Sequence, residues 1–472
     1  MIRHNEIEIV SGRPFANCKL DRKQYANVLT SIVSTYADGF VLAINNKWGA
    51  GKTTFVKMWE QDLKDNEYQT VYFNAWENDF ENNPLTALMG ELKTLTKIDK
   101  DPKFTSVLKK GAVLSKHLAP MVLKAIASRY IDTKEFGDAI ENITNGATEI
   151  FENEVNEYAE KKKGIAEFRT SLSEFIANTN EGKPLIFVVD ELDRCRPDYA
   201  VAILEQIKHF FSVPNIVFVL SIDKEQLGNA VRGVYGNDRI DADEYLRRFI
   251  DVEYSIPEPD AEKYCDYLYN YFGFNDFFYS DFRMRSRALD YDGTRFLKTT
   301  KMLFKNTNIS LRQQEKIFAH SRLVLRSFSD NNFVFPGLFL FLIYIKILNT
   351  DFYAKIKLKH LNLIDLQKEF INSIKSIKIA DDTHIEITDL EAYLIHYYNN
   401  YIATYPNRTE LYMYEEATKK NKLLITSLTD KTSDNSRFLR MLEHMSTGYD
   451  SGGDLDIGYL LQKIDLTEAV KF

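Results

Sequence analysis

The chain has 472 residues, of which 44% are hydrophobic and 27% are charged, as in ordinary globular proteins. Its formal net charge of -8 argues against a broad nucleic-acid-binding surface, because phosphate binding needs a positive field. The three cysteines are widely spaced and form no metal or redox motif, and the N-terminus lacks the apolar run of a signal peptide. These features predict a cytoplasmic protein. The net charge does not support a nucleic-acid partner.

Two stretches are apolar enough to raise the question of a membrane span. Residues 111–131 carry several basic side chains, and residues 333–345 contain Pro336 and Gly337 and end at Lys346. A spanning helix needs about 20 mostly apolar residues. We therefore expect no membrane span and interpret both stretches as buried or interfacial helices.

Short apolar runs alternate with helical patterns from about residue 40 to residue 256. This alternation predicts an α/β fold with a doubly wound, mostly parallel sheet. A long helical stretch at about 85–180 interrupts the alternation and is predicted to be an insertion. The predicted strands lie at 41–44, 70–73, 185–189, 216–220 and 252–256, and the predicted core helices at 53–63, 199–211 and 225–232.

The pattern changes after Pro257, where the chain becomes mostly helical. We predict three parts on this basis. Residues 1–260 form the α/β core with its helical insertion, residues 261–330 form a helical, lid-like region, and residues 331–472 form a helical C-terminal domain of unknown role.

The segment 46–53, with the sequence Asn-Lys-Trp-Gly-Ala-Gly-Lys-Thr, joins the first predicted strand to the first core helix. It matches the end of the phosphate-binding pattern G-x-x-x-x-G-K-[ST], in which backbone N–H groups and a helix N-terminus surround phosphate. Lys52 is predicted to reach the β- and γ-phosphates of ATP, and Thr53 to coordinate Mg²⁺. The predicted nucleotide-binding residues are Asn46, Lys47, Trp48, Gly49, Ala50, Gly51, Lys52, Thr53 and Thr54.

Asn46 stands where this pattern has its first glycine. Asparagine tolerates a left-handed backbone better than most residues do, so we expect the loop to keep its shape. The alternative is an ordinary glycine-containing turn before a helix. The order of strand, loop and helix favours the phosphate-binding interpretation.

Carboxylates follow the most hydrophobic predicted strand, in the order Asp190-Glu191-Leu192-Asp193. Ligands of open α/β sheets bind at this carboxyl edge. Asp190 is predicted to hold Mg²⁺, and Glu191 to orient and polarise the attacking water. Adjacent strand residues point to opposite faces, so both acids can serve one site only if the chain turns there. The alternative is a solvated acidic turn.

Five further polar residues are candidate sensors of the γ-phosphate or arginine fingers. Asp223 follows a predicted strand, where a helix N-cap is an equally good interpretation. For Arg247 and Arg248, a surface ion pair is the alternative, and for Arg194 the alternative is that it orders the loop after the strand. The candidates are Asp223, Arg194, Arg247, Arg248 and Arg312.

Taken together, these strings resemble the KAP family of P-loop NTPases over about residues 20–330. The resemblance rests on the loop at 48–53, Phe-Asn-Ala-Trp at 73–76, the acidic string at 190–195 and Phe-Val-Leu-Ser-Ile-Asp at 218–223. Tyr-Leu-Arg-Arg at 245–248 and Arg312 resemble later family positions. The sequence departs from the family at Asn46, at Glu191, where the family often has Asp, and at Leu311, where Pro is common.

The resemblance implies an ATPase of the additional-strand, catalytic-glutamate type that acts as a nucleotide-driven switch or assembly device. Many family members carry membrane segments between the two nucleotide-binding motifs, but the matching region here is too charged to span. Bacterial members without such segments are often found in mobile elements and antiviral defence systems.

The main hypothesis is therefore a Mg²⁺-dependent ATPase whose hydrolysis drives a conformational change, together with a protein partner or self-assembly. Turnover is expected to be slow or partner-stimulated if one of the arginines acts from another subunit. One alternative is a phosphotransferase acting on a small molecule or a nucleic-acid end. The other is a scaffold that binds nucleotide without hydrolysing it.

Overall fold

The computed structural model describes residues 7–36, 39–81, 83–96, 101–111, 147–179, 182–236, 239–305, 308–377, 384–432, 435–446 and 455–466. The chain divides into two compact units, Asn5–Glu258 and Pro259–Phe472. Each unit is considered by itself. The apolar stretch at 112–131 and the part of the predicted insertion at 112–146 lie outside the described residues, and the division predicted near residue 330 stays a prediction.

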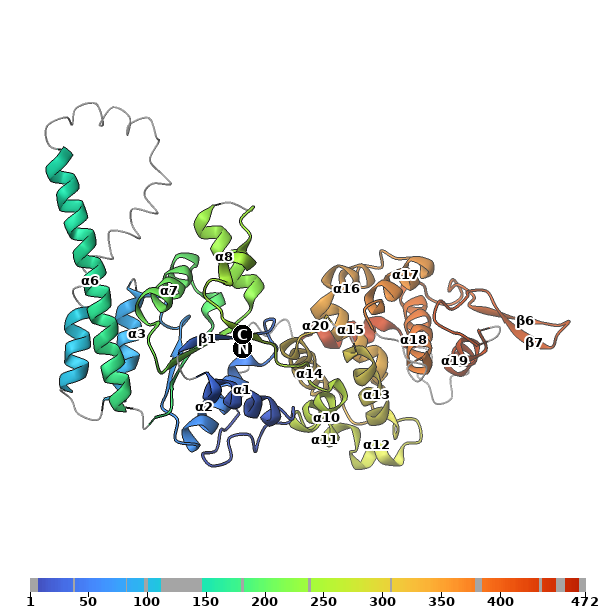
Figure 1. The fold of residues 1–472 in the computed structure, drawn as a ribbon. Helices are drawn as coiled ribbons and strands as arrows, with labels where there is room; N and C mark the ends of the chain where they lie inside the picture. The colour runs from blue at the N-terminus through green and yellow to red at the C-terminus, as the bar shows by residue number, and fades with distance from the viewer. Residues whose placement is uncertain are drawn as a thin grey trace. The chain divides into compact units, whose positions relative to one another are not determined.

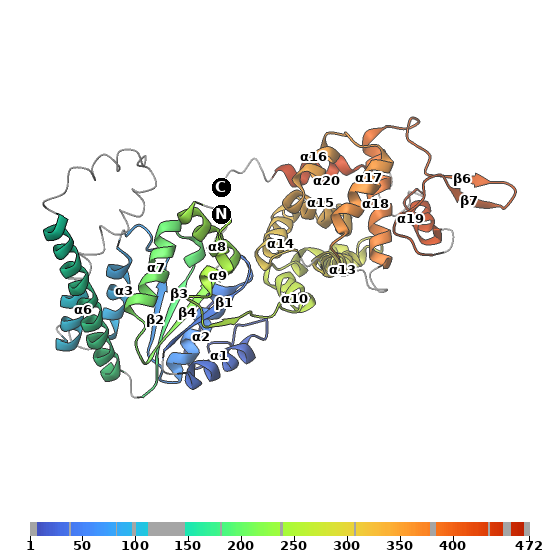
Figure 2. The same ribbon diagram turned by 45° about the horizontal axis from the view of Figure 1, so that its top comes forward.

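The first unit is built on a five-stranded parallel sheet with the order β2-β3-β4-β1-β5 (Figure 2). This confirms the predicted α/β class and its parallel sheet. Strand β4 lies between β1, which leads into the glycine-rich loop, and β3, which ends in the acids. The strands are β1 (Phe40–Asn45), β2 (Thr70–Asn74), β3 (Leu185–Asp190), β4 (Ile216–Ile222) and β5 (Val252–Tyr254).

Helices cover both faces of this sheet. On one face, α1 (Lys23–Thr35) and α2 (Lys52–Asp65) pack on alternate residues of β1, β3 and β4, with Trp59 at the centre of the core. On the other face lie α3 (Pro84–Leu92), α7 (Pro197–Phe210), α8 (Lys224–Tyr235) and α9 (Ala242–Leu246). β3 and β4 are buried along their whole length, which explains their unbroken apolar sequences.

The described part of the insertion is helical, as predicted. It consists of α3, the short 3₁₀ turn η1 (Lys93–Leu95), helical residues 102–111 and the long helix α6 (Ala147–Thr179). Phe168 and Phe175 of α6 bury their rings in the same core as α7 and the sheet. Figures 1 and 2 show α6 running alongside α3. The apolar stripe of α6 therefore attaches the insertion to the sheet.

The second unit is mainly helical. Its centre is α15, whose residues from Leu338 to Ile345 are all buried, so the apolar stretch at 333–345 is a core helix. Among the described residues, no helix combines the length and apolarity needed to cross a bilayer. The helices are α10 (Ala261–Tyr271), α11 (Asn275–Phe278), α12 (Asp281–Arg285), α13 (Asp292–Phe304), α14 (Leu311–Leu325), α15 (Pro336–Leu348), α16 (Thr350–Lys357), α17 (Leu363–Ile374), α18 (His384–Ile402), α19 (Ser436–Ser446) and α20 (Ile457–Leu466).

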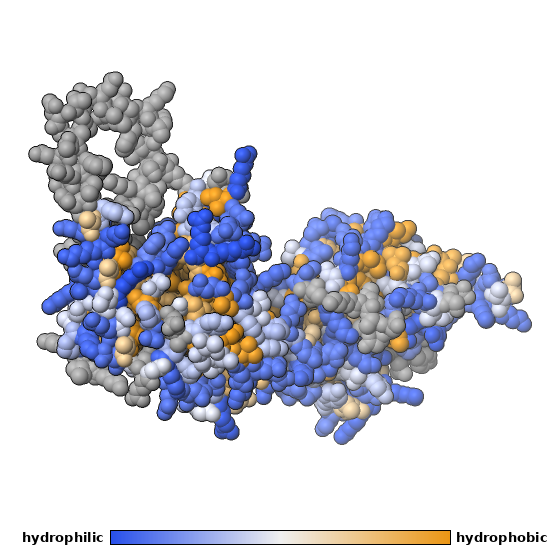
Figure 3. Space-filling view, in the orientation of Figure 1, coloured by the Kyte–Doolittle hydropathy of each residue, from blue (hydrophilic) through white to orange (hydrophobic). Residues whose placement is uncertain are grey.

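A β-hairpin in this unit was not predicted. Strands β6 (Tyr412–Glu415) and β7 (Lys420–Leu423) pair antiparallel and project from the helices (Figure 1). The turn contains Lys419 at a positive φ of 54°, instead of the Asn-Gly pair that identifies a hairpin in a sequence. Hydrophobic side chains reach the surface near its base (Figure 3), and the exposed ones of this region include Met413, Leu424 and Leu428.

Candidate nucleotide-binding site

The glycine-rich loop occupies the predicted position between β1 and α2. Gly49 and Gly51 have φ values of 78° and 77°, in the left-handed region that side chains disfavour. Gly51 is the N-cap of α2, and Lys52 is its first residue. The free amide end of α2 therefore opens onto the loop, which is the geometry that binds phosphate groups.

Lys52 is 8% exposed and lies among loop carbonyls and carboxylates. Its ammonium donates to the carbonyl oxygens of Asn46 and Lys47, the latter at 3.3 Å. Burial lowers the pKa of Lys52, and the negative charges of Asp193, Asp223 and Asp190 oppose that shift. The structure thus places the predicted phosphate-binding lysine beside the acidic edge of the sheet.

Asn46 has a role other than the one we expected. Its φ is not positive, so the tolerance of asparagine for left-handed geometry does not explain it. Instead, its side-chain Nδ2 donates to the Ile256 carbonyl at 2.8 Å, and its Oδ1 accepts the Ile256 N–H at 2.9 Å. Its own N–H donates to Ile222 O at 3.1 Å. Asn46 therefore links the start of the loop to the chain just beyond β5.

The chain does turn between the two predicted catalytic acids. Asp190 ends β3 and is 1% exposed, and its carboxylate accepts hydrogen bonds from the Tyr72 hydroxyl (2.8 Å) and the Glu191 N–H (3.0 Å). Glu191 has φ 60° and ψ 25°, a left-handed conformation that is uncommon for a residue with a side chain. This turn satisfies the condition under which both acids can serve one site.

The Glu191 carboxylate is held by two neighbours. Arg194 lies 2.7 Å away, and the Asn74 side chain at the tip of β2 hydrogen-bonds to it. Burial raises the pKa of Glu191, whereas Arg194 and Asn74 act to lower it. The Arg194 guanidinium also lies over the Trp76 ring, 5.7 Å from its centroid. Arg194 is thus a partner of Glu191 within the chain.

Asn74 and Tyr72 were not identified from the sequence. Both lie on β2, whose partner in the sheet is β3, with Asn74 opposite Asp190 in register. Burial and the Asp190 charge raise the pKa of Tyr72, so its hydroxyl stays protonated and remains a donor to Asp190. Two signals in the sequence pointed to Asn74: it ends the apolar run at 70–73, at the carboxyl edge of the predicted sheet, and it belongs to the Phe-Asn-Ala-Trp string of the family resemblance.

Trp48 connects the loop to two further acids. Its indole N–H donates to the Asp193 carboxylate, and its backbone N–H donates to Asp223 Oδ2 at 3.1 Å. Asp223 also accepts the Gln226 N–H at 3.4 Å and so caps α8. The N-cap interpretation of Asp223 is therefore correct, and the same carboxylate contacts the loop. Burial raises the pKa of Asp193, against the hydrogen bond from Trp48.

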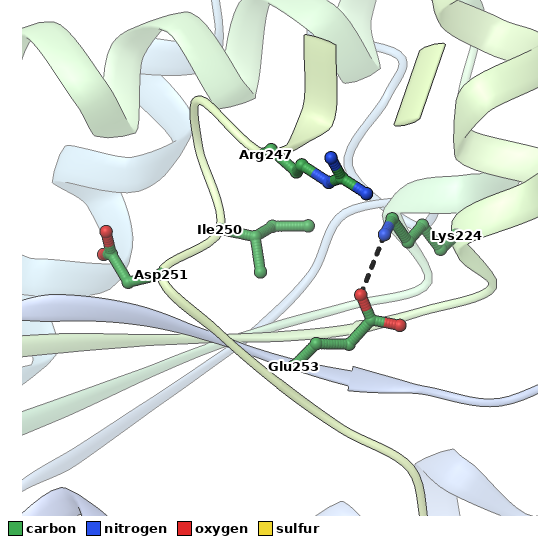
Figure 4. A pocket seen from close by; sticks show the side chains of 5 residues that line it. All are labelled: Lys224, Arg247, Ile250, Asp251 and Glu253. Atoms are coloured by element: carbon green, nitrogen blue, oxygen red, sulfur yellow. Dashed lines mark hydrogen bonds and ion pairs between the residues drawn. The ribbon is translucent and has the colours of Figure 1, made fainter. Parts of the chain in front are cut away.

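The remaining arginine candidates have ordinary surroundings. Arg247 forms a surface ion pair with Glu244 at 3.2 Å and lines a cavity of about 250 Å³ with Lys224, Ile250, Asp251 and Glu253 (Figure 4). Arg248 is exposed, and Arg312 is an exposed residue of α14 in the second unit. Their roles as fingers or sensors stay predictions.

The donor set fits a magnesium–nucleotide complex. Thr53 lies in the first turn of α2 and supplies a hydroxyl, and Asp190 supplies carboxylate oxygens from the end of β3. Mg²⁺ prefers such oxygen ligands and normally takes only one or two from the protein, with the rest from phosphate and water. Thr53 and Asp190 are the residues that would hold it.

Comparison with known proteins agrees with this architecture. A family model described as the KAP family P-loop domain matches residues 22–326. The chain belongs to the KAP family of P-loop NTPases. The resemblance seen in the sequence motifs is thereby confirmed, and the topology with β4 between β1 and β3 contains the additional strand that the resemblance implied.

This KAP-family chain is similar to the phage T7 exclusion protein of Escherichia coli K12, with 21% identity over 233 residues. That match covers 47% of this chain but only 30% of the exclusion protein. It is also similar to an uncharacterized protein of Methanocaldococcus jannaschii, at 31% identity over 177 residues, covering 32% of this chain and 88% of that one. Among solved structures, it is similar to the Aeropyrum pernix ORC2 protein in ADPNP–ADP complexes, with a TM-score of 0.36 and 11% identity over 90% of this chain and 94% of that one.

Proposed function

We propose that this KAP-family chain binds ATP with Mg²⁺, hydrolyses it, and uses the change of nucleotide state as a switch. One observation carries the proposal. The left-handed turn at Glu191 places its carboxylate beside Asp190, at the sheet edge where Lys52 and the glycine loop also lie. A scaffold that only binds nucleotide needs the loop but has no use for a second, uncommonly oriented acid.

Each residue of the site has a defined task in this proposal. The amides of the loop and the Lys52 ammonium bind the phosphates, and Thr53 and Asp190 hold Mg²⁺, which neutralises charge on the phosphate oxygens. Tyr72 fixes one oxygen of Asp190. Glu191 accepts a proton from the attacking water, a role that needs its ionised form. Arg194 and Asn74 lower the pKa of this carboxyl group against the effect of burial and so favour its ionised form.

The contacts of Asn46 support the switch. Lys52 donates to the Asn46 carbonyl in this structure, so a shift of the lysine toward phosphate acts directly on Asn46. The Asn46 side chain is bonded to Ile256, two residues before the boundary between the units at Glu258. We propose that this short path carries a change at the loop to the chain that leads into the helical unit.

A role in defence against phage forms part of the proposal. It is supported by the name of a relative, the phage T7 exclusion protein, although the match covers only 30% of that protein. Phosphotransfer to a small molecule or a nucleic-acid end is a weaker alternative, because the proposed role of Glu191 is to activate water. One observation supports the non-hydrolysing scaffold: the carboxylate of Glu191, the proposed base, is engaged in an ion pair with Arg194.

Phosphate release by the purified chain with ATP and Mg²⁺ tests the proposal, with Lys52→Ala and Glu191→Gln measured beside the wild type. Nucleotide binding is measured in parallel by calorimetry. We expect Glu191→Gln to bind ATP without turnover and Lys52→Ala to lose binding. Binding without turnover by the wild type would contradict hydrolysis by the chain alone, and no binding by any of the three would contradict the nucleotide site.

A further inference from the structure

Arg22 lies behind the glycine-rich loop. It immediately precedes α1, 29 residues before Gly51 in the sequence, and it is 4% exposed. Its backbone carbonyl accepts the N–H groups of Tyr25 and Ala26 and so begins α1. A buried arginine at such a place has to be bound by acceptors, because a desolvated guanidinium is costly.

Its terminal nitrogens bind two successive carbonyl groups of the loop. Nη2 donates to Ala50 O at 2.8 Å, and Nη1 donates to Gly51 O at 3.1 Å. The planar guanidinium presents its donors in a fixed fork, so this two-point contact sets the orientation of two neighbouring peptide groups.

The orientation of these carbonyl groups decides where the loop amides point. In a trans peptide, the C=O of one residue and the N–H of the next point in opposite directions. Holding the Ala50 and Gly51 carbonyls toward Arg22 therefore turns the N–H groups of Gly51 and Lys52 to the opposite side. These are the amides at the N-terminus of α2, where phosphate oxygens bind in loops of this type.

Arg22 is itself firmly supported. Helix α1 packs on α2 through a shared core that includes Leu29, Val33 and Phe55. The indole N–H of Trp59 on α2 donates to the Thr30 hydroxyl of α1 at 2.9 Å. α1 is thus fixed to the helix that the loop begins, and the guanidinium has little freedom to follow a distorted loop.

We propose that Arg22 is a positioning residue for phosphate binding, which orients the amides of Gly51 and Lys52 before nucleotide arrives. The inference rests on the proposed function and identifies a residue that acts on the loop through its carbonyl groups. Preorganisation of this kind improves affinity, because the loop need not be ordered on binding. It predicts an effect on the binding of ADP as well as ATP, since the oriented amides do not distinguish a γ-phosphate.

The test compares wild type with Arg22→Ala, Arg22→Lys and the neighbouring control Lys23→Ala, which removes an exposed charge from the same turn. Dissociation constants for ADP and ATP are measured by calorimetry, with kcat and KM from phosphate release and the melting temperature of each nucleotide-free protein. Losing two charge-assisted hydrogen bonds predicts a roughly 10- to 100-fold weaker affinity for both nucleotides in Arg22→Ala. KM should rise in parallel, and kcat should change less than about threefold, because Arg22 contacts no reacting atom.

Lysine keeps the charge but not the fork, so Arg22→Lys should bind with intermediate affinity, and Lys23→Ala should bind like wild type. Full recovery by lysine, or a loss of kcat with unchanged KM, would overturn the positioning role. Wild-type affinity in a folded Arg22→Ala protein would overturn it as well. If the wild type binds neither nucleotide, the proposed function fails and this inference fails with it. If the wild type and Arg22→Ala bind equally well, only this inference fails.

Discussion

Removing Arg194 should change the pH dependence of hydrolysis in a defined direction. Burial raises the pKa of Glu191, and the Arg194 guanidinium at 2.7 Å is the largest influence that lowers it. A proposed base must be ionised, so activity falls as pH drops through this pKa. Arg194→Ala removes the stabilising charge, and the acidic limb of the rate profile should then move to higher pH.

The size of the displacement follows from the contact. Both side chains are largely buried, with 25% of Arg194 and 12% of Glu191 exposed, so solvent screens the pair only in part. A hydrogen bond to a charged group contributes about 1.5 to 3 kcal/mol. At about 1.4 kcal/mol for each pH unit, the acidic limb should move up by roughly one to two pH units. Asn74→Ala should move it the same way by a smaller amount, because a neutral donor is lost.

The assay is phosphate release at saturating ATP from pH 5 to pH 9. Lys64→Ala is the matched control, since it removes a cation from an ion pair with Glu60 on α2, a pair that does not include Glu191. The limb of the control should coincide with that of the wild type. An acidic limb that stays in place in Arg194→Ala, or moves to lower pH, would refute the assignment of Glu191 as the base held by Arg194.

Three other changes test separate contacts. Asn46→Asp keeps the acceptor for the Ile256 N–H but loses the donor to its carbonyl. Hydrogen exchange of the Ser255, Ile256 and Glu258 amides should therefore accelerate about tenfold, and unchanged exchange would contradict the link between the loop and the chain beyond β5. Trp48→Phe should abolish the change in tryptophan fluorescence on adding ADP, because Trp48 is the indole in the loop; a change that persists in the variant would locate the reporter elsewhere. Glu391→Ala removes the buried acceptor of Gln367 and of the hydroxyls of Ser427 and Thr429, and urea denaturation should show a loss of about 3 to 5 kcal/mol in the helical unit. A loss below about 1 kcal/mol would mean that this network contributes little.

Local sequence signals were sufficient for the sheet and the loop. The five predicted strands correspond to β1 through β5, and the continuous apolar runs of β3 and β4 reflect burial on both faces. Positions 49 and 51 favour glycine because their backbone is left-handed, and this preference can be recognised from the residue type alone. Helix α1 was not predicted, although it covers one face of the sheet, because no motif accompanies it.

Contacts between distant segments were not readable. Asn74 reaches Glu191 only because β2 pairs with β3, and Arg22 reaches the loop only because α1 packs on α2. Asn46 shows a different limit. The sequence showed that this residue departs from the loop pattern, and we explained it by the backbone preference of asparagine. In the structure, its side chain instead forms hydrogen bonds with Ile256. The residues that orient the site are thus harder to predict than those that contact the ligand.

The position of β4 accounts for the spacing of the site. Neighbouring strands lie about 4.8 Å apart, so a strand inserted between β1 and β3 separates their carboxyl ends by roughly 10 Å. Lys52 and Thr53 follow β1, whereas Asp190 and Glu191 follow β3. This gap of two strand spacings is where we propose that the phosphates and Mg²⁺ bind. Asp223, which follows β4, lies between the two strand ends and accepts the hydrogen bond of the Trp48 amide.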